Sequence, residues 1–459
     1  MPLAIPLTWH IKNAKHSRIG KFLQERFAHT TSLTADANRL LKQADTLLLN
    51  APTSSYPHGY IGMAIDYRIR YSFSITPNQE LAAFTGARML PHMSEFFMER
   101  PYSPELIDTF FASLDATLKT VQPVRRRLET AAERILARYC YVLSLFEEVY
   151  RNPREAQKKG RLFEPPPKKS VDELLAIPED IWIDDLCAMA WSFYDNYHNL
   201  LSRPCKLNPG FMGIGDIATS DGDLIVDGCL IEIKASKNSS LDPKWLRQLA
   251  GYLLLDFNDT YSIHSVSIYM AGQGLLLPPW SVTDCLRLLT GDNTVTLTQL
   301  RQEFRTLAEK GVQEKRKEEK TVQTRTVVEQ PTARHWITRV MLEMAVLNAV
   351  LDNMLKMDDL NISELTKEVE KHSKDITREI STAPHDVDDT VLEGVKRING
   401  KLIELRLNGK LIELRQKNEL MDGEKSTEEL ISMARQFQVT ISDVHSMLNA
   451  STLNLRNHL

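Results

Sequence analysis

The chain has 459 residues, of which 42% are hydrophobic and 25% are charged, and its formal net charge is −4. These ordinary values exclude a disordered tail protein, a collagen and a small disulfide scaffold. Nucleic-acid binders usually carry a basic excess, and the bulk charge shows none, although a local basic groove is compatible with it.

The sequence shows no targeting signal and no disulfide or zinc pattern. No apolar run approaches the roughly 18 residues that span a bilayer, and the opening residues lack the pattern of a secretory signal. The five cysteines are far apart and in no Cys-x-x-Cys pair, so we expect reduced thiols. The expected location is the cytoplasm, with no membrane segment.

The first half of the chain has mostly helical patterns. Residues 35–49 form a helix-like stretch, and residues 104–150 carry apolar residues at steps of three and four, which predicts long helices. Three prolines at 165–167 mark a surface connection, and a further helix is expected over about 184–201. Only residues 213–277 change to a period of two, which predicts strands.

The last third of the chain differs in composition. Residues 301–330 are dense in mixed charge, which predicts a charged linker or a solvated helix, with a basic binding patch as the alternative. Residues 331–459 are numerous enough for a mostly helical interaction domain. Ile337 to Leu355 repeats apolar residues at heptad-like steps around Asn348, so this seam either pairs with another helix or forms an internal core stripe. We expect residues 331–459 to bind a protein partner or to form a homo-oligomer.

The most informative stretch runs from Asp221 to Lys234. Asp227-Gly228 lies between two apolar, β-rich runs, which is a strong signal for a hairpin with a two-residue turn. Counting from the turn pairs residues 226, 225 and 224 with residues 229, 230 and 231. The same count places Asp223 opposite Glu232 and puts both on one face with Lys234.

This hairpin face is a candidate metal site. Two opposed carboxylates repel each other, and a hard cation such as Mg²⁺ (or Mn²⁺) would relieve the repulsion of Asp223 and Glu232. Lys234 could hold or deprotonate a water beside that metal, which gives the parts needed to hydrolyse a phosphodiester. The register also places Asp221 opposite Lys234, so a cross-strand salt bridge on a solvent-facing hairpin is the alternative.

The helix that follows supports the candidate site. Asp242-Pro243 is a good helix start, with Asp at the N-cap and Pro at the first position. Lys244, Gln248 and Tyr252 then recur at four-residue steps on one polar face. That face could supply hydrogen bonds to a metal-bound water or to a strand phosphate.

In this order the residues resemble the PD-(D/E)xK nuclease superfamily, and the Gln-x-x-x-Tyr helix is similar to its RecB-like exonuclease branch. The resemblance implies an α/β fold, restriction-endonuclease-like, with a mixed sheet flanked by helices. It implies Asp223 and Glu232 as metal ligands and Lys234 as the residue that positions the attacking water. Gln248 and Tyr252 would be the supporting catalytic pair on the helix.

RecB-like enzymes also carry Gly-x-x-x-His on an early helix, and Gly62 to Asp66 has that spacing with Asp in place of His. The resemblance makes Asp66 a third metal ligand, and an ordinary acid is the alternative. A nuclease-like domain over residues 1–300 would then contain a large helical insertion at about 85–205.

The function implied is Mg²⁺-dependent hydrolysis of phosphodiester bonds in DNA, in bacterial, antiviral defence against foreign DNA. The alternative is a non-catalytic binding or scaffold protein with a nuclease-like core.

Overall fold

The structure is a computed structural model. It describes residues 5–49, 56–74, 82–97, 102–121, 127–215 and 217–322, and further along the chain residues 340, 347, 362–381, 383, 392–397 and 399–400. The chain divides into two compact units. The first comprises Met1–Pro77, Thr109–Ser144 and Val171–Thr326, and the second comprises Asn78–Asp108, Leu145–Ser170 and Val327–Leu459.

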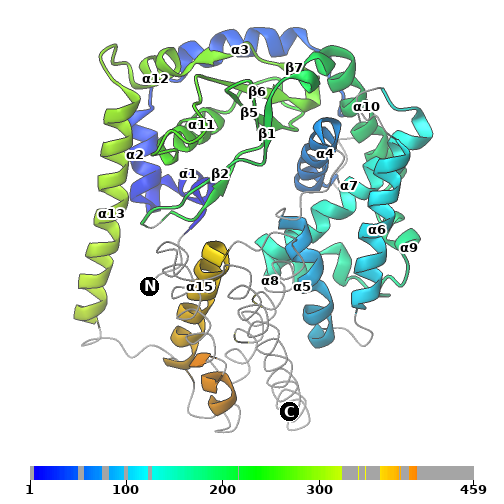
Figure 1. The fold of residues 1–459 in the computed structure, drawn as a ribbon. Helices are drawn as coiled ribbons and strands as arrows, with labels where there is room; N and C mark the ends of the chain where they lie inside the picture. Colours follow the sequence, from blue (N-terminus) through cyan, green and yellow to red (C-terminus); the bar gives the residue numbers. More distant parts are fainter. Residues whose placement is uncertain are drawn as a thin grey trace, which may run out of the picture. The chain divides into compact units, whose positions relative to one another are not determined.

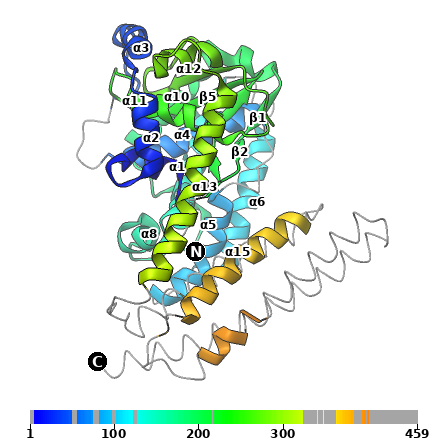
Figure 2. The ribbon, with the colours of Figure 1, turned by 90° about the vertical axis from the view of Figure 1, so that its left-hand side faces the viewer.

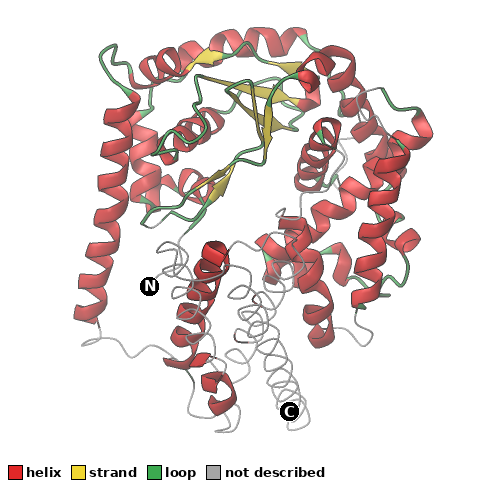
Figure 3. Ribbon diagram, viewed as in Figure 1, coloured by secondary structure: helices red, strands yellow, loops and turns green. Residues whose placement is uncertain are grey.

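A mixed six-stranded sheet forms the centre of the first unit (Figure 3). Its strands are β1 (Cys205–Leu207), β4 (Leu224–Val226), β5 (Cys229–Lys234), β6 (Ser265–Met270), β7 (Leu275–Leu276) and β8 (Trp280–Ser281). The order is β1-β4-β5-β6-β7, and β8 also pairs with β6. β2 (Gly210–Phe211) and β3 (Ser220–Asp221) form a separate two-stranded sheet.

The expected hairpin is confirmed, with the counted register. β4 and β5 are antiparallel and pair Val226 with Cys229, Ile225 with Leu230 and Leu224 with Ile231. Residues 227 and 228 both have positive φ, 49° and 70°, as a type I′ turn requires. The turn therefore fixes which side chains of β4 and β5 share a face.

β5 and β6 are parallel, and the helix α11 (Pro243–Leu255) makes the crossover between them. α11 begins as expected, because Asp242 accepts a hydrogen bond from the backbone N–H of Lys244 at 2.8 Å and Pro243 occupies the first turn. β6 is buried along almost its whole length, as expected of a strand with neighbours on both edges and helices on both faces.

Helices cover both faces of this sheet (Figure 1). On one face, Leu230, Val266 and Ile268 belong to a core shared with the helices α1 (Leu7–Lys12), α2 (Arg18–Arg26), α3 (Thr31–Gln43), α11 and α12 (Val282–Thr290). On the other face, Tyr269 contacts Phe193 of α10 (Asp180–Tyr197), with ring centroids 5.3 Å apart. α10 in turn packs against α4 (His58–Phe73). The predicted fold class, a mixed sheet flanked by helices, is thus confirmed.

The structure corrects the start of the predicted linker at residue 301. Residues Leu297–Val322 form one helix, α13, which lies beside α2 (Figure 2). Leu300, Phe304 and Ala308 are buried in the core of the first unit, and the Phe304 ring lies 5.7 Å from that of Phe22. Apolar residues at steps of four anchor this part of the charged stretch, so it belongs to the fold.

The remaining helices belong to the first unit (residues 171–175), to the second unit, or partly to each. Their bounds are α5 (Ala82–Phe97), α6 (Pro104–Thr120), α7 (Thr130–Arg151), α8 (Pro153–Lys159), α9 (Val171–Leu175) and α15 (Ile362–Ser381). The expected pairing seam around Asn348 lies outside the described residues. Among the helices that are described, none is long and apolar enough to cross a membrane. All five cysteines are free thiols.

Candidate active site

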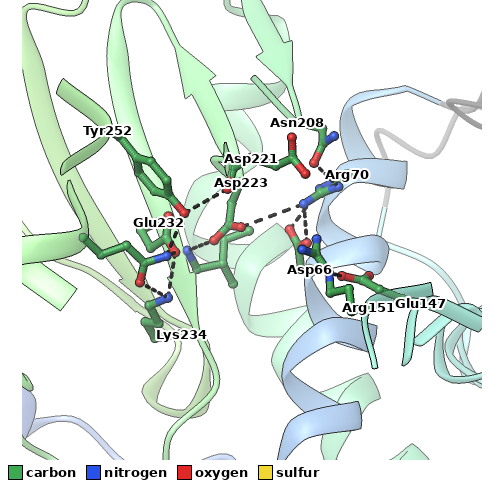
Figure 4. A network of polar contacts seen from close by, with 12 residues as sticks. Asp66, Arg70, Glu147, Arg151, Asn208, Asp221, Asp223, Glu232, Lys234 and Tyr252 are labelled. Atoms are coloured by element: carbon green, nitrogen blue, oxygen red, sulfur yellow. Dashed lines mark hydrogen bonds and ion pairs between the residues drawn. The ribbon is translucent and has the colours of Figure 1, made fainter. Parts of the chain in front are cut away.

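Four of the expected residues form one hydrogen-bonded chain between β5 and α11 (Figure 4). Glu232 Oε1 accepts from Lys234 Nζ and from Gln248 Nε2, each at 2.7 Å. Lys234 also donates to Gln248 Oε1 at 3.2 Å, and Gln248 Nε2 lies 2.7 Å from the Tyr252 hydroxyl. The period of two along β5 and the four-residue step along α11 therefore bring these side chains together.

Tyr252 extends the chain to the segment that precedes β4. Its hydroxyl donates to the backbone carbonyl of Asp221 at 2.9 Å, and its ring stacks on Phe211 with centroids 5.0 Å apart. Asp221 itself pairs with Gly210 in the small sheet, so the hairpin register does not continue to it. Lys234 forms its ion pair with Glu232. This pair replaces the cross-strand pair with Asp221 that the hairpin register alone allowed.

Asp223 lies one residue before β4 and two residues before Ile225, so its side chain is on the same face as that of Ile225. Ile225 pairs with Leu230, which shares a face with Glu232, and Asp223 is therefore on the face of Glu232. Its Oδ2 accepts from the backbone N–H of Ile233 at 2.6 Å, which ties the carboxylate to β5. Its side chain is 18% exposed, whereas Glu232 is 2% exposed. The two carboxylates thus share one face of the hairpin, where the charge of Asp223 acts on Glu232.

Asp66 lies on α4, as expected for an early helix, but both of its carboxylate oxygens face Arg70. Arg70 Nε donates to Asp66 Oδ1 at 3.0 Å, and Arg70 Nη2 donates to Asp66 Oδ2. Arg70 Nη1 also donates to Asn208 Oδ1 at 3.0 Å, and Nη2 lies 3.8 Å from Asp223 Oδ1. Arg70 therefore stands between Asp66 and Asp223 (Figure 4).

The charges of the site shift the pKa of three side chains. Burial, followed by the negative charge of Asp223, raises the pKa of Glu232 to about 7. Burial acts to lower the pKa of Lys234, but the charges of Glu232 and Asp223 outweigh it, so the net pKa is raised and the amine stays an ammonium. Burial, then the charges of Glu232 and Asp223, raises the pKa of Tyr252, which keeps its hydroxyl protonated.

A divalent cation fits this donor set as a two-carboxylate site. Glu232 Oε2 is buried and has no hydrogen-bond partner among the described residues, which is costly for a carboxylate unless a cation binds it. No group of three His, Cys, Asp or Glu side chains in the described part of the chain could hold a metal by itself. Mg²⁺ is often held by one or two carboxylates, with water and substrate phosphates completing its ligands, so Asp223 and Glu232 suffice.

The sequence interpretation missed Arg70 and Asn208. Arg70 follows Asp66 by four residues, and this spacing permits an ion pair on one helix face. The spacing was the feature of the sequence from which Arg70 could have been found. Asn208 had none, because its contact with Arg70 joins residues 138 positions apart in the chain.

No protein-family model, no curated protein and no solved structure matches the chain.

Proposed function

We propose that the chain is a Mg²⁺-dependent (or Mn²⁺-dependent) nuclease that hydrolyses phosphodiester bonds in DNA, a RecB-like member of the PD-(D/E)xK superfamily. The observation that carries the proposal is the buried oxygen Oε2 of Glu232, which has no partner among the described residues while Asp223 and Lys234 lie on the same face. A carboxylate pair can hold a divalent cation, and an adjacent ammonium can orient a water beside it, which together support metal-assisted hydrolysis.

Each side chain of the site has a separate task in this proposal. When bound by Asp223 and Glu232, the cation would acidify a water and stabilise negative charge on the phosphate. Lys234, held as an ammonium, donates hydrogen bonds and so orients the attacking water rather than deprotonating it. Gln248 fixes the rotamers of Glu232 and Lys234 by bonding to both, and Tyr252 fixes Gln248.

The second hypothesis is a binding or scaffold protein that keeps a nuclease-like core without turnover. It is favoured by the closed ion pair of Lys234 and Glu232, which leaves the ammonium satisfied within the protein. The two hypotheses differ in what Mn²⁺ does, because a scaffold has no need to bind it.

The test combines metal binding with cleavage. Purified protein is titrated with Mn²⁺ by calorimetry and incubated with linear and nicked duplex DNA and with single-stranded DNA, with Mg²⁺ or with EDTA. We expect Mn²⁺ binding and cutting that EDTA stops. Glu232→Gln should lose both, and Lys234→Met, which keeps the aliphatic stem, should bind Mn²⁺ but cut at least about 100-fold more slowly.

Arg305→Met on α13 is the control, because its side chain pairs with Glu309 outside the site. Wild-type protein that binds no Mn²⁺ would support the scaffold hypothesis instead. The role in defence against foreign DNA, and a protein partner recruited through residues 331–459, are part of the same proposal and rest on the resemblance and on the chain's organisation.

A further inference from the structure

We infer that Arg70 binds the phosphate of the DNA strand being cut, and that Asp66 and Asn208 are the residues that position it. This inference rests on the proposed nuclease function and deepens it. It also assigns Asp66 a role different from the metal ligand that the sequence spacing suggested.

The geometry of Arg70 is that of a clamped guanidinium. Two of its nitrogens bond the two oxygens of Asp66 and a third bonds Asn208 Oδ1, so its plane is fixed from two separate segments of the chain. The side chain is 10% exposed, which leaves it little freedom to move. A phosphate would meet this guanidinium through the fixed positive charge at Nη2, beside Asp223, because Asp66 already occupies its Nε–Nη2 edge.

Arg70 lies next to Asp223, one of the two carboxylates that would hold the cation. Nη2 lies 3.8 Å from Asp223 Oδ1. This distance is too long for a direct hydrogen bond, but it is short enough for Arg70 and Asp223 to lie beside the same ligand. A phosphate oxygen bound to a cation on Asp223 would therefore stand beside this guanidinium. The opposite end of the site is occupied by Lys234, so the phosphate would lie between two positive side chains (Figure 4).

The charge balance of the site agrees with this placement. Asp66, Asp223 and Glu232 carry three negative charges when ionised, and Arg70 and Lys234 carry two positive ones. With all three carboxylates ionised, these five side chains have one excess negative charge, which repels a phosphodiester. Binding of a divalent cation turns this into one excess positive charge, which matches the single charge of the phosphodiester. The inference thus predicts that DNA binds after the metal.

Asp66 is disfavoured as a metal ligand by the same contacts. Both of its oxygens accept hydrogen bonds from Arg70, so a metal would have to displace a bidentate ion pair to reach them. Glu232, in contrast, has one oxygen without a partner among the described residues. The two carboxylates are therefore separable by experiment.

The test measures DNA affinity and metal affinity independently. DNA affinity is read from the anisotropy of a fluorescein-labelled duplex with Mg²⁺, in a Lys234→Met background that prevents cutting and removes the same positive charge from every protein compared. Metal affinity is read by Mn²⁺ calorimetry without DNA. In that background we expect Arg70→Met to weaken DNA binding about 10- to 100-fold and to lower the slope of log Kd against log salt concentration by about one.

The same variant should leave Mn²⁺ affinity within about two-fold or improve it, because it removes a cation from beside Asp223. Arg70→Lys should fall between wild type and Arg70→Met, since it keeps the charge but not the planar group that Asp66 and Asn208 hold in place. Asp66→Asn should weaken DNA binding as Arg70→Met does, while its affinity for Mn²⁺ stays unchanged. Arg305→Met, which removes one positive charge outside the site, should change neither.

Three outcomes would overturn the inference. Unchanged DNA affinity for Arg70→Met, with wild type cutting DNA, removes it and leaves the proposed function standing. Loss of Mn²⁺ binding by at least ten-fold in Asp66→Asn would make Asp66 a metal ligand after all. Wild-type protein that binds no Mn²⁺ would overturn the proposed function, and this inference with it. Thermal unfolding of every variant separates these results from misfolding.

Discussion

At the scale of single residues, Glu232 has the least ordinary environment in the described site. It is 2% exposed, one oxygen bonds Lys234 and Gln248, and the other has no partner in the described structure. A buried carboxylate resists ionisation, and the neighbouring Asp223 adds to that resistance, so its pKa is raised to about 7. The function we propose requires the ionised form, which a bound cation would stabilise.

This shift predicts a pH dependence of stability in metal-free protein. Glu232 has an ordinary pKa of 4.5 when unfolded and about 7 when folded, so the folded state holds the proton over a wider range. Its contribution is fully present below pH 4.5 and is lost as pH rises through 7, by about 3 kcal/mol in all. Urea unfolding of EDTA-treated protein at pH 5 and pH 8 should show this fall.

Glu232→Gln supplies the comparison, because it keeps the shape of the side chain without the titration. Its unfolding free energy should fall by less between the same two pH values, since only the other groups still titrate. Saturating Mn²⁺ should reduce the fall in wild type, because the cation binds the ionised carboxylate. Identical pH dependence in wild type and variant would show that Glu232 titrates normally.

At the scale of elements, α4 is the helix whose placement matters most for the site. It is buried on almost every side, and its interior includes the two arginines Arg68 and Arg70. Each has a carboxylate partner, since Arg70 bonds Asp66, and Arg68 bonds Glu133 of α7 at 2.5 and 2.8 Å. Buried guanidinium groups need such partners, so these ion pairs fix the orientation of α4 and thereby of Arg70.

The Arg68–Glu133 pair gives a stability prediction. Both side chains are at most 4% exposed, so Glu133→Ala leaves a buried, uncompensated positive charge. We expect it to lower the unfolding free energy by about 3–5 kcal/mol. Chemical denaturation followed by circular dichroism measures the change. DNA affinity should fall as well, because α4 carries Arg70.

The double variant Arg68→Met, Glu133→Leu is the matched control. It removes both charges and keeps apolar volume, so it should be clearly more stable than Glu133→Ala. A double variant as unstable as the single one would mean that packing volume, and not the unpaired charge, determines the cost.

At the scale of the whole molecule, every described residue of the candidate site belongs to the first unit, which ends at Thr326. α13 completes that unit by burying Leu300, Phe304 and Ala308. The charged stretch is therefore partly structural, and the boundary for separating the tail lies after α13 rather than before it.

A pair of truncations tests this boundary. Residues 1–322 should keep the Mn²⁺ affinity of the full chain, because the whole site and α13 are retained. Residues 1–296 should lose it, because removing Leu300 and Phe304 exposes the apolar surface around Phe22 and costs about 1.5–3 kcal/mol for each buried side chain.

Hydrogen exchange adds a second measurement on the longer truncation. β5 and β6 should stay protected, whereas residues 78–108 and 145–170 should exchange faster, because they share the second unit with the removed tail. Loss of Mn²⁺ binding by residues 1–322 would show that the site depends on the tail.

The sequence by itself determined the hairpin, its register and the start of α11, because each depends on local rules. A two-residue turn with two positive φ angles sets which residues face each other, and a capped helix start sets the phase of Gln248 and Tyr252. Asp223, Glu232, Lys234, Gln248 and Tyr252 lie within about 30 consecutive residues, so these rules were enough to group them.

Only the tertiary structure decided the contact of Arg70 with Asn208 and the role of residues 297–308. Arg70 reaches Asn208 across 138 positions, and Phe304 packs on Phe22 across an even longer separation. Such contacts form because large apolar faces are buried together and buried charges must find partners, and neither requirement has a fixed spacing in the sequence. For that reason the resemblance could place Asp66 on a helix, and the four-residue step permitted its ion pair with Arg70, while the contact of Arg70 with Asn208 required the packed fold.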